Sequence, residues 1–314
     1  MTFSRRDICR LALASLPLSA ALASDNDSRI DGVQLGVQTY SFRDLAIDQA
    51  IQAMITDKLF DCELFSPHIE AGGVDATRGM SHPAGGNRPS PSERAEMRKA
   101  HEEKLRQWRL TVPLDYFAKV RKKFDNAGIN IYSYNLSLGE TATDDEIDRS
   151  FDMAKALGVD IITTSTTLPM AARMAPFTDK HKMIVGFHGH SNVKDPKQFS
   201  TPDRFAKALA MSKYYRINLD IGHFTAAGFE PVEYINQMHN KIILLHLKDR
   251  KKNDGPNVVW GEGDTPIKQV LLELKEKKYP IPAFIEYEYK GTGSSTEEVA
   301  KCYAYCKQAL NASA

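Results

Sequence analysis

The feature that most constrains the fold is a regular alternation of short apolar segments with longer segments of helical periodicity, from residue 33 to residue 310. Short runs rich in Val, Ile, Tyr and Phe are typical of strands, and a 3.6-residue apolar period is typical of helices. Eight strands are expected, at residues 33–42, 61–66, 130–137, 160–166, 183–190, 216–223, 242–249 and 282–289. Helices are expected at residues 46–57, 112–126, 144–157, 170–176, 202–212, 231–239, 266–278 and 296–310.

Eight strand–helix units in one chain favour an α/β fold of the (β/α)₈ TIM-barrel type. An open, doubly wound sheet is the alternative, but no glycine-rich phosphate loop follows the first strand. We therefore expect residues 24–314 to form a single barrel domain. Because barrel enzymes place their active sites at the carboxyl ends of the strands, the functional residues are expected there.

A long insertion at residues 67–111 follows the second strand, on the same face of the predicted barrel. Its first half is rich in Gly and Pro, and residues 92–109 have helical character. Ser90 and Glu93 fit a capping box at the start of this helix. Loops of this length in a compact domain are usually functional or disordered. We expect a partial lid over the barrel mouth, with a solvated flap as the alternative.

The N-terminus has the pattern of an export signal. Ser4-Arg5-Arg6 precedes an apolar run at residues 11–23 that ends in Ala21-Leu22-Ala23, an A-x-A cleavage pattern. The paired arginines resemble a twin-arginine signal, and the apolar run is too short for a stable membrane span. We expect residues 1–23 to be a signal peptide that engages the twin-arginine export machinery, and the protein to be periplasmic or otherwise exported. An uncleaved amphipathic helix is the alternative.

Net charge and cysteine content argue against a nucleic-acid-binding protein and against a disulfide-stabilised fold. The first 23 residues carry a net charge of +2 out of a formal +1 for the chain, so the remainder is −1. This balance argues against a nucleic-acid partner, which would need a basic face. Cys62, Cys302 and Cys306 remain after the signal, too few for a disulfide framework, and we expect them to be packing residues.

Polar side chains stand at the ends of four successive predicted strands. Taken singly, a His on a strand is usually a hydrogen-bonded core residue and a Glu at a strand end is usually solvated. Four strands in succession would bury many polar groups together, which is costly unless a metal ion or similar group compensates. Imidazoles and carboxylates suit Mn²⁺, Co²⁺ or Zn²⁺. The residues are His188 and His190, Asp220 and His223, His246 and Lys248, and Glu286 and Glu288.

Four motifs are similar to the sugar phosphate isomerase/epimerase family of the xylose isomerase-like TIM-barrel superfamily. They are DIGH at 220–223, LHLKD at 245–249, WGEGD at 260–264 and FIEYE at 284–288, and LGVQTYSFRD at 35–44 also fits the first strand of that family. The resemblance implies one divalent metal ion held by Asp220, His246 and Glu286. It also implies a substrate contact for His223. The first metal ligand departs from the family pattern, because His188 stands where the family most often has Glu.

The resemblance implies isomerisation, epimerisation or β-elimination of a sugar, and each of these begins with removal of a proton next to a carbonyl group. Glu286 is the candidate base, and Lys248, Arg250 or His223 would stabilise the developing oxyanion. The candidate substrate contacts are Tyr40, His190, Arg250, Trp260, Glu262 and Glu288.

The number of bases limits the reaction. A metal-bound imidazole at position 188 has no free basic nitrogen for the second face of a carbon atom. We therefore expect an isomerase or a lyase, rather than a two-base epimerase, acting on a sugar or keto-sugar. The lyase would be a dehydratase or would eliminate an alkoxide from a keto-glycoside. A non-catalytic sugar-binding barrel is a further alternative, and a DNA-repair nuclease is disfavoured by charge and export signal.

Overall fold

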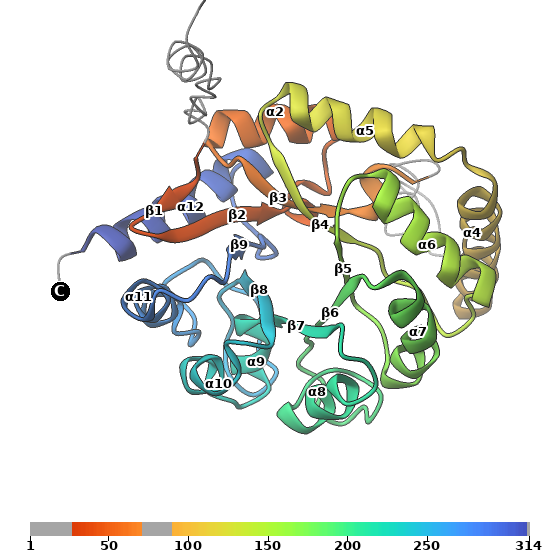
Figure 1. Ribbon diagram of the computed structural model, residues 1–314. Helices are drawn as coiled ribbons and strands as arrows, with labels where there is room; N and C mark the ends of the chain where they lie inside the picture. The colour runs from red at the N-terminus through yellow and green to blue at the C-terminus, as the bar shows by residue number, and fades with distance from the viewer. Residues whose placement is uncertain (1–26, 71–89, 313–314) are drawn as a thin grey trace, which may run out of the picture.

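A computed structural model describes residues 27–70 and 90–312. Eight parallel strands form a closed barrel in chain order, and β2 pairs with β9 to close it (Figure 1). The short strand β1 (Arg29–Ile30) pairs antiparallel with β2. The expected (β/α)₈ barrel is confirmed. Its strands are β2 (Val33–Gln38), β3 (Asp61–Phe65), β4 (Asn130–Asn135), β5 (Ile161–Thr164), β6 (Ile184–His188), β7 (Tyr215–Asp220), β8 (Ile242–Leu247) and β9 (Ala283–Ile285).

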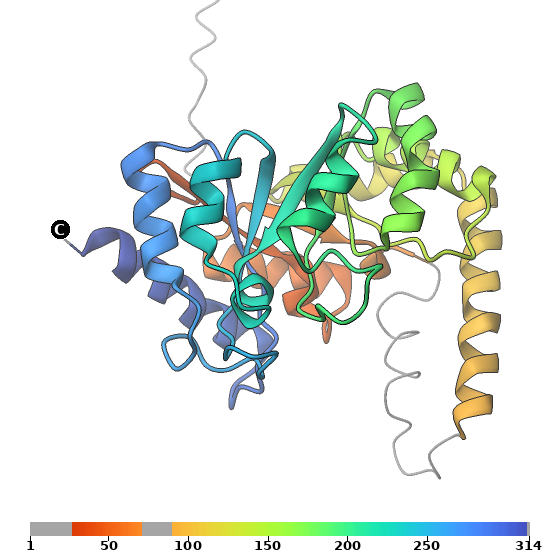
Figure 2. The same ribbon diagram turned by 90° about the horizontal axis from the view of Figure 1, so that it is seen from below.

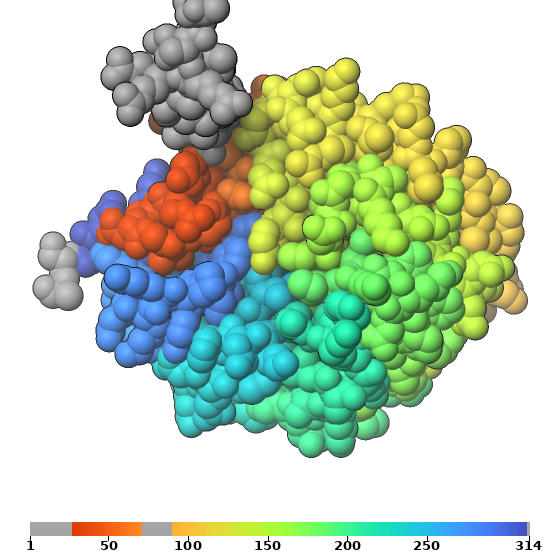
Figure 3. All heavy atoms as spheres, in the orientation of Figure 1, coloured from red at the N-terminus to blue at the C-terminus, as the bar shows by residue number. Residues whose placement is uncertain are grey.

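Helices surround the barrel, so that successive segments occupy neighbouring sectors and the first sector meets the last (Figures 1 and 3). Two short 3₁₀ helices, η1 (Thr39–Phe42) and η2 (Ser66–His68), follow β2 and β3. Among the described residues, no helix is long and apolar enough to cross a membrane. The α-helices are α2 (Ile47–Asp57), α4 (Pro91–Thr111), α5 (Asp115–Asn126), α6 (Asp144–Ala156), α7 (Leu168–His181), α8 (Pro202–Leu209), α9 (Ile221–Ala226), α10 (Pro231–Met238), α11 (Ile267–Lys277) and α12 (Ser295–Asn311).

Successive side chains of each strand point to opposite faces, so one set packs in the main hydrophobic core and the other set points to the opposite side of the strand. Residues such as Leu35, Val185 and Leu245 are fully buried in the main hydrophobic core. On the other face of these strands, two glycines make room for large side chains: a Cβ at Gly36 would lie 2.4 Å from Phe284. A Cβ at Gly186 would lie 2.8 Å from Ile243. The strand positions nearer the barrel mouth are polar, and the candidate functional site is built from them.

The strands end earlier than their sequence pattern predicts. The first strand stops at Gln38, where a 3₁₀ helix begins, and the sixth stops at Asp220, where α9 begins. The pattern continued past these points because the residues that turn into the barrel mouth are themselves buried. The helix expected at 170–176 extends over Leu168–His181, with Pro176 inside it. His223, the last residue of the expected strand 216–223, lies within α9.

The described part of the insertion is α4, which projects along one side of the molecule (Figure 2). Its capping box is confirmed, since Ser90 Oγ accepts from the Glu93 N–H at 3.2 Å and Glu93 Oε2 accepts from the Ser90 N–H at 2.6 Å. Buried Arg109 binds Glu70 and Glu146, each at 2.7 Å, and so attaches α4 to α6. The expected lid includes residues 71–89, and the expected signal peptide covers 1–23; both ranges lie outside the described residues.

Three cysteines of the barrel, Cys62, Cys302 and Cys306, are buried and free. Burial raises the pKa of Cys62 and of Cys306 well above the usual range of a thiol. They pack in the main core, as expected from the sequence.

Candidate metal centre and substrate cavity

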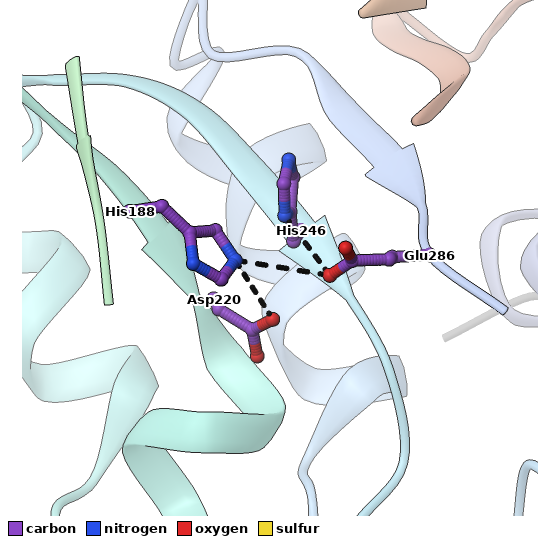
Figure 4. Close-up of side chains that lie close together, drawn as sticks. All are labelled: His188, Asp220, His246 and Glu286. Atoms are coloured by element: carbon purple, nitrogen blue, oxygen red, sulfur yellow. Dashed lines mark hydrogen bonds and ion pairs between the residues drawn. The ribbon is translucent and has the colours of Figure 1, made fainter. Parts of the chain in front are cut away.

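Four side chains from neighbouring strands converge at the carboxyl-terminal mouth of the barrel (Figure 4). His188 ends β6, Asp220 ends β7, His246 lies near the end of β8, and Glu286 directly follows β9. All four are buried, and one ligand atom from each lies within 4.8 Å of the others. The fold therefore brings together the four side chains that the sequence singled out as metal ligands.

Two atoms of this group, His188 Nε2 and Asp220 Oδ2, face each other without forming a hydrogen bond. His188 Nε2 lies 3.4 Å from Asp220 Oδ2 and 3.7 Å from Glu286 Oε2. Among the buried side-chain atoms of the described chain, both His188 Nε2 and Asp220 Oδ2 have no hydrogen bond. Asp220 Oδ2 has the Lys248 ammonium 3.0 Å away, but His188 Nε2 has no compensating contact, and an unsatisfied buried polar atom costs about 1–3 kcal/mol. Two imidazole nitrogens and two carboxylates fit a single divalent ion of the Zn²⁺, Mn²⁺ or Co²⁺ type.

The carboxylates of this group are oriented by their other contacts. Asp220 caps α9, because its Oδ1 accepts from the His223 N–H at 2.7 Å, and this leaves Oδ2 directed at the centre. Glu286 Oε2 lies 3.1 Å from His246 Nδ1. Both ligand carboxylates therefore present one oxygen to the same point.

The remaining ring nitrogens of the two histidines point away from the centre. His188 Nδ1 lies 3.3 Å from Ser165 Oγ. His246 Nε2 lies 2.5 Å from Oε2 of Glu63, a fully buried residue of β3. Burial alone would lower the pKa of His246, but the carboxylates of Glu63 and Glu286 raise it well above its usual range. A carboxylate behind a ligand histidine is the usual way in which a protein fixes a metal-binding ring.

Lys248 neutralises the carboxylates from a buried position. Its Nζ lies 2.5 Å from Glu288 Oε2, 2.8 Å from Glu286 Oε2 and 3.0 Å from Asp220 Oδ2. Burial alone would raise the pKa of Asp220 and of Glu286, but the Lys248 ammonium holds both below their usual range. Lys248 lies against Gly222, where a Cβ would come within 2.3 Å of its Cγ. The DIGH motif therefore needs glycine at this position.

His223 is held between two cations. Its Nδ1 lies 2.5 Å from Arg250 Nη1, and its Nε2 lies 3.4 Å from Lys248 Nζ. Burial lowers the pKa of His223, and Lys248 lowers it further, to well below its usual range. Both cations only donate, and a neutral imidazole accepts at one nitrogen; the shorter contact, from Arg250, makes Nδ1 the acceptor, so the proton lies on Nε2 and the 3.4 Å approach of Lys248 is not a hydrogen bond. His223 therefore offers a hydrogen-bond donor at the mouth of the barrel.

The metal-ligand group opens into a cavity of about 260 Å³. This volume is close to the lower end of ordinary ligand pockets, about 300–1,000 Å³, and suits a small molecule. One wall is aromatic, because Tyr40 and Phe65 meet edge to face at 5.0 Å. The lining residues are Gln38, Tyr40, Phe65, Asn135, Ser137, Ser165, His188, His190, His223, His246, Lys248, Glu286 and Glu288.

Three of the expected substrate contacts, Tyr40, His190 and Glu288, line this cavity. His190 packs edge to face on His188 at 5.0 Å, and burial lowers its pKa to about 4, so its imidazole is neutral at pH 7. Glu288 lies against Lys248 and accepts from Asn257 Nδ2 at 3.2 Å. These side chains are within reach of a ligand bound at the centre.

The other three expected substrate contacts do not line the cavity. Arg250 donates to Ser191 and His223, and it therefore acts behind the imidazole. Trp260 is buried against Tyr305 at a ring distance of 5.8 Å, and Glu262 is exposed. Trp260 and Glu262 lie away from the cavity because the neighbouring Asp249 side chain fixes the course of their loop.

Asp249 folds the loop after β8 away from the cavity. Its Oδ2 accepts from the backbone N–H groups of Gly261 and Gly263 at 2.8 and 2.9 Å, and its Oδ1 accepts from that of Thr265 at 3.2 Å. The Gly263 backbone approaches so closely that a Cβ there would lie 1.8 Å from Asp249 Oδ1. This loop is therefore organised by Asp249.

Comparison with known proteins gives a family and a fold. A family model described as xylose isomerase-like TIM barrel matches residues 70–306. No curated protein matches the chain. Three solved structures illustrate the similarity, all at less than 20% identity.

The first is a sugar phosphate isomerase/epimerase from Parabacteroides distasonis, 18% identical, with a TM-score of 0.57 over 87% of this chain and 95% of that one. The second is the probable 3-DHS dehydratase AsbF from Bacillus anthracis, 14% identical, with a TM-score of 0.58 over 89% and 99%. The third is an IolI protein with a bound zinc atom, 11% identical, with a TM-score of 0.61 over 89% and 99%. At these identities the likeness concerns the fold.

Proposed function

Because the chain belongs to the xylose isomerase-like TIM-barrel family, we propose that it is a metal-dependent enzyme that removes a proton next to a carbonyl group of a sugar or keto-sugar. The observation that carries this proposal is the buried group of His188, Asp220, His246 and Glu286, in which one ligand atom from each residue lies within 4.8 Å of the others and His188 Nε2 has no hydrogen bond. The zinc atom of the IolI structure and the isomerase and dehydratase names of the other two neighbours support it.

Different residues of this chain would act as the base, stabilise the negative charge and bind the sugar. A bound divalent ion would polarise the carbonyl and hydroxyl oxygens of the substrate and so acidify the adjacent C–H bond. Glu286 takes the proton, since its carboxylate lines the cavity beside the ligand group. His223 donates its Nε2–H to the oxygen that gains negative charge, and Lys248 adds a positive charge beside it. Tyr40 and Phe65 supply an apolar wall for the carbon face of a sugar.

The reaction class depends on the number of free bases, and His188 limits that number. Its Nε2 faces the ligand group and its Nδ1 faces the Ser165 hydroxyl, so neither nitrogen is free for the second face of a carbon. One base is enough for an aldose–ketose shift, because the same carboxylate returns the proton to the neighbouring carbon. We therefore place a sugar isomerase ahead of a two-base epimerase.

A lyase is the second candidate, because elimination also needs only one base. The dehydratase name of the AsbF structure, which has the same fold, favours it. A non-catalytic sugar-binding barrel is the remaining alternative. It predicts ligand binding without turnover.

Product analysis in D₂O tests the proposal. Purified protein supplied with a divalent ion is incubated with aldoses, keto-sugars and keto-glycosides. An isomerase gives an aldose–ketose pair with solvent deuterium at the transferred position, whereas a lyase gives an unsaturated product. Glu286→Gln should lose about 10²–10⁴ of the rate, as expected for a general base. Glu262→Gln, an exposed carboxylate outside the cavity, is the matched control and should keep full activity.

Two results would overturn the proposal. Clean epimerisation with full activity in Glu286→Gln would refute both the base and the one-base argument. Binding of a sugar with no product under any metal would leave only the binding barrel.

A further inference from the structure

A buried carboxylate lies behind the metal-ligand group, in a part of the barrel that the sequence motifs did not indicate. Glu63 of β3 is fully buried. Its Oε2 lies 2.5 Å from Gln38 Nε2 and 2.5 Å from His246 Nε2. Its Oε1 accepts from Thr163 Oγ1 and, at 3.1 Å, from Asn218 Nδ2. All four contacts come from other strands, β2, β5, β7 and β8.

Such a carboxylate needs a functional explanation. The interior of a (β/α)₈ barrel is usually filled by branched apolar side chains, and an ionised group buried there is costly. A hydroxyl and two amide groups direct their donors at Glu63, so the surrounding strands are built to hold a negative charge. The fourth contact is a ring nitrogen of a predicted metal ligand. Stability alone gives no reason for this arrangement, because apolar residues of similar volume stabilise a core equally well or better.

The geometry of His246 supplies the reason. Glu63 accepts from Nε2–H, so Nδ1 is the nitrogen that must give up its proton to bind a metal ion. Nδ1 faces the ligand group and, in the metal-free protein, donates to Glu286 Oε2 at 3.1 Å. Without an acceptor behind the ring, the proton would be free to lie on either nitrogen and the ring to rotate. Glu63 also places a third buried negative charge next to a centre in which His188 is a neutral ligand.

We propose that Glu63 is the positioning residue of the metal centre: it fixes the tautomer and orientation of His246 and so sets the affinity of the site for a divalent cation. This inference rests on the proposed metal-dependent function. It makes Glu63 a determinant of metal binding, and it assigns the residue no contact with substrate.

The test measures metal binding directly. Metal-free protein is titrated with Co²⁺ and then with Zn²⁺ in competition, and the visible absorption of Co²⁺ reports the ligand geometry. Glu63→Gln and Glu63→Met both remove the charge, and the apolar variant keeps the side-chain volume if the amide variant does not fold. Thr163→Val is the matched control, because it removes a different hydrogen bond to the same carboxylate and leaves the His246 contact in place.

We expect both Glu63 variants to bind Co²⁺ and Zn²⁺ about 10–100-fold more weakly than the wild type, with an altered Co²⁺ spectrum. The metal-free Glu63→Met protein should be less stable than Thr163→Val, because several buried donors lose their acceptor, so affinities are compared at a temperature at which both variants are folded. Wild-type affinity and spectrum in a folded Glu63 variant would overturn the inference and leave the metal centre standing. An equal loss of affinity in Thr163→Val would also overturn it, since general packing would then explain the effect. Absence of binding by the wild type would overturn the metal centre and this inference together.

Discussion

Replacing Lys248 by Met should destabilise the metal-free protein strongly, and a divalent ion should reverse part of the loss. The Lys248 side chain is 2% exposed, and its Nζ is within 3.0 Å of carboxylate oxygens of Asp220, Glu286 and Glu288. The variant removes the ammonium but keeps most of the alkyl chain, so packing against Gly222 is preserved. What remains is a group of buried carboxylates without their shared cation.

The magnitude follows from this burial. Removing one partner of a buried ion pair typically costs about 3–5 kcal/mol, because the other partner is left uncompensated. With about 2–4 °C per kcal/mol for a domain of this size class, the melting temperature should fall by roughly 10 °C. A divalent ion bound by Asp220 and Glu286 would replace the lost positive charge. Added Zn²⁺ should therefore raise the melting temperature of Lys248→Met more than that of the wild type.

The assay is thermal unfolding of metal-free protein, with and without Zn²⁺, followed by circular dichroism. Lys252→Met is the matched control, since Lys252 is half-exposed and its Nζ lies 3.2 Å from the exposed Glu230 carboxylate. A surface pair of this kind contributes only about 0–1 kcal/mol. If Lys248→Met is as stable as the Lys252 variant, the reasoning about the buried charges is refuted.

Three further predictions concern other parts of the chain. Burial raises the pKa of Asp57 to about 7, so the native state holds an extra proton between about pH 4 and pH 7 and loses stability as the pH rises through this range. Asp57→Asn should therefore have a free energy of unfolding about 1–2 kcal/mol higher than that of the wild type in urea at pH 8, after allowance for solvent screening. Equal stability of the two proteins at pH 8 would contradict this. Arg109→Met should lower the free energy of unfolding by about 3–5 kcal/mol, because buried Glu70 loses its arginine partner and Glu146 keeps only Arg106; a loss below 1 kcal/mol in urea would refute the argument. We propose that residues 1–23 direct export, so replacing Arg5 and Arg6 by Lys should retain the precursor in the cytoplasm; N-terminal sequencing that finds Met1 or Thr2 on native, cytoplasmic protein would show otherwise.

The strand pattern and the strand-end residues were predictable from the sequence because both follow from periodicity. A period of two placed His246 and Lys248 on one face, and the structure directs both to the barrel mouth. The number of strands and their order required only that eight apolar runs alternate with helices. Strand ends were less predictable, because residues such as Ile221 and Gly222 remain buried after the strand has turned into α9.

Glu63 was not predicted because its role depends on a contact across the barrel. It lies 183 positions before His246 in the chain, and it stands inside an ordinary predicted strand. The only local signal was one carboxylate between two apolar residues, Cys62 and Leu64, at a position whose period directs it inward. Trp260 and Glu262 failed as cavity residues for a similar reason, because the hydrogen bonds of Asp249 decide where their loop lies.

The central claim is that His188, Asp220, His246 and Glu286 hold one divalent metal ion. Elemental analysis of protein purified without chelators tests this most directly, with His246→Ala as the variant and His239→Ala, a histidine stacked on Tyr279 outside the cavity, as the matched control. The account predicts about one divalent ion per chain in the wild type and in the control, and loss of most of it in His246→Ala. Equal metal content in the wild type and His246→Ala would contradict it.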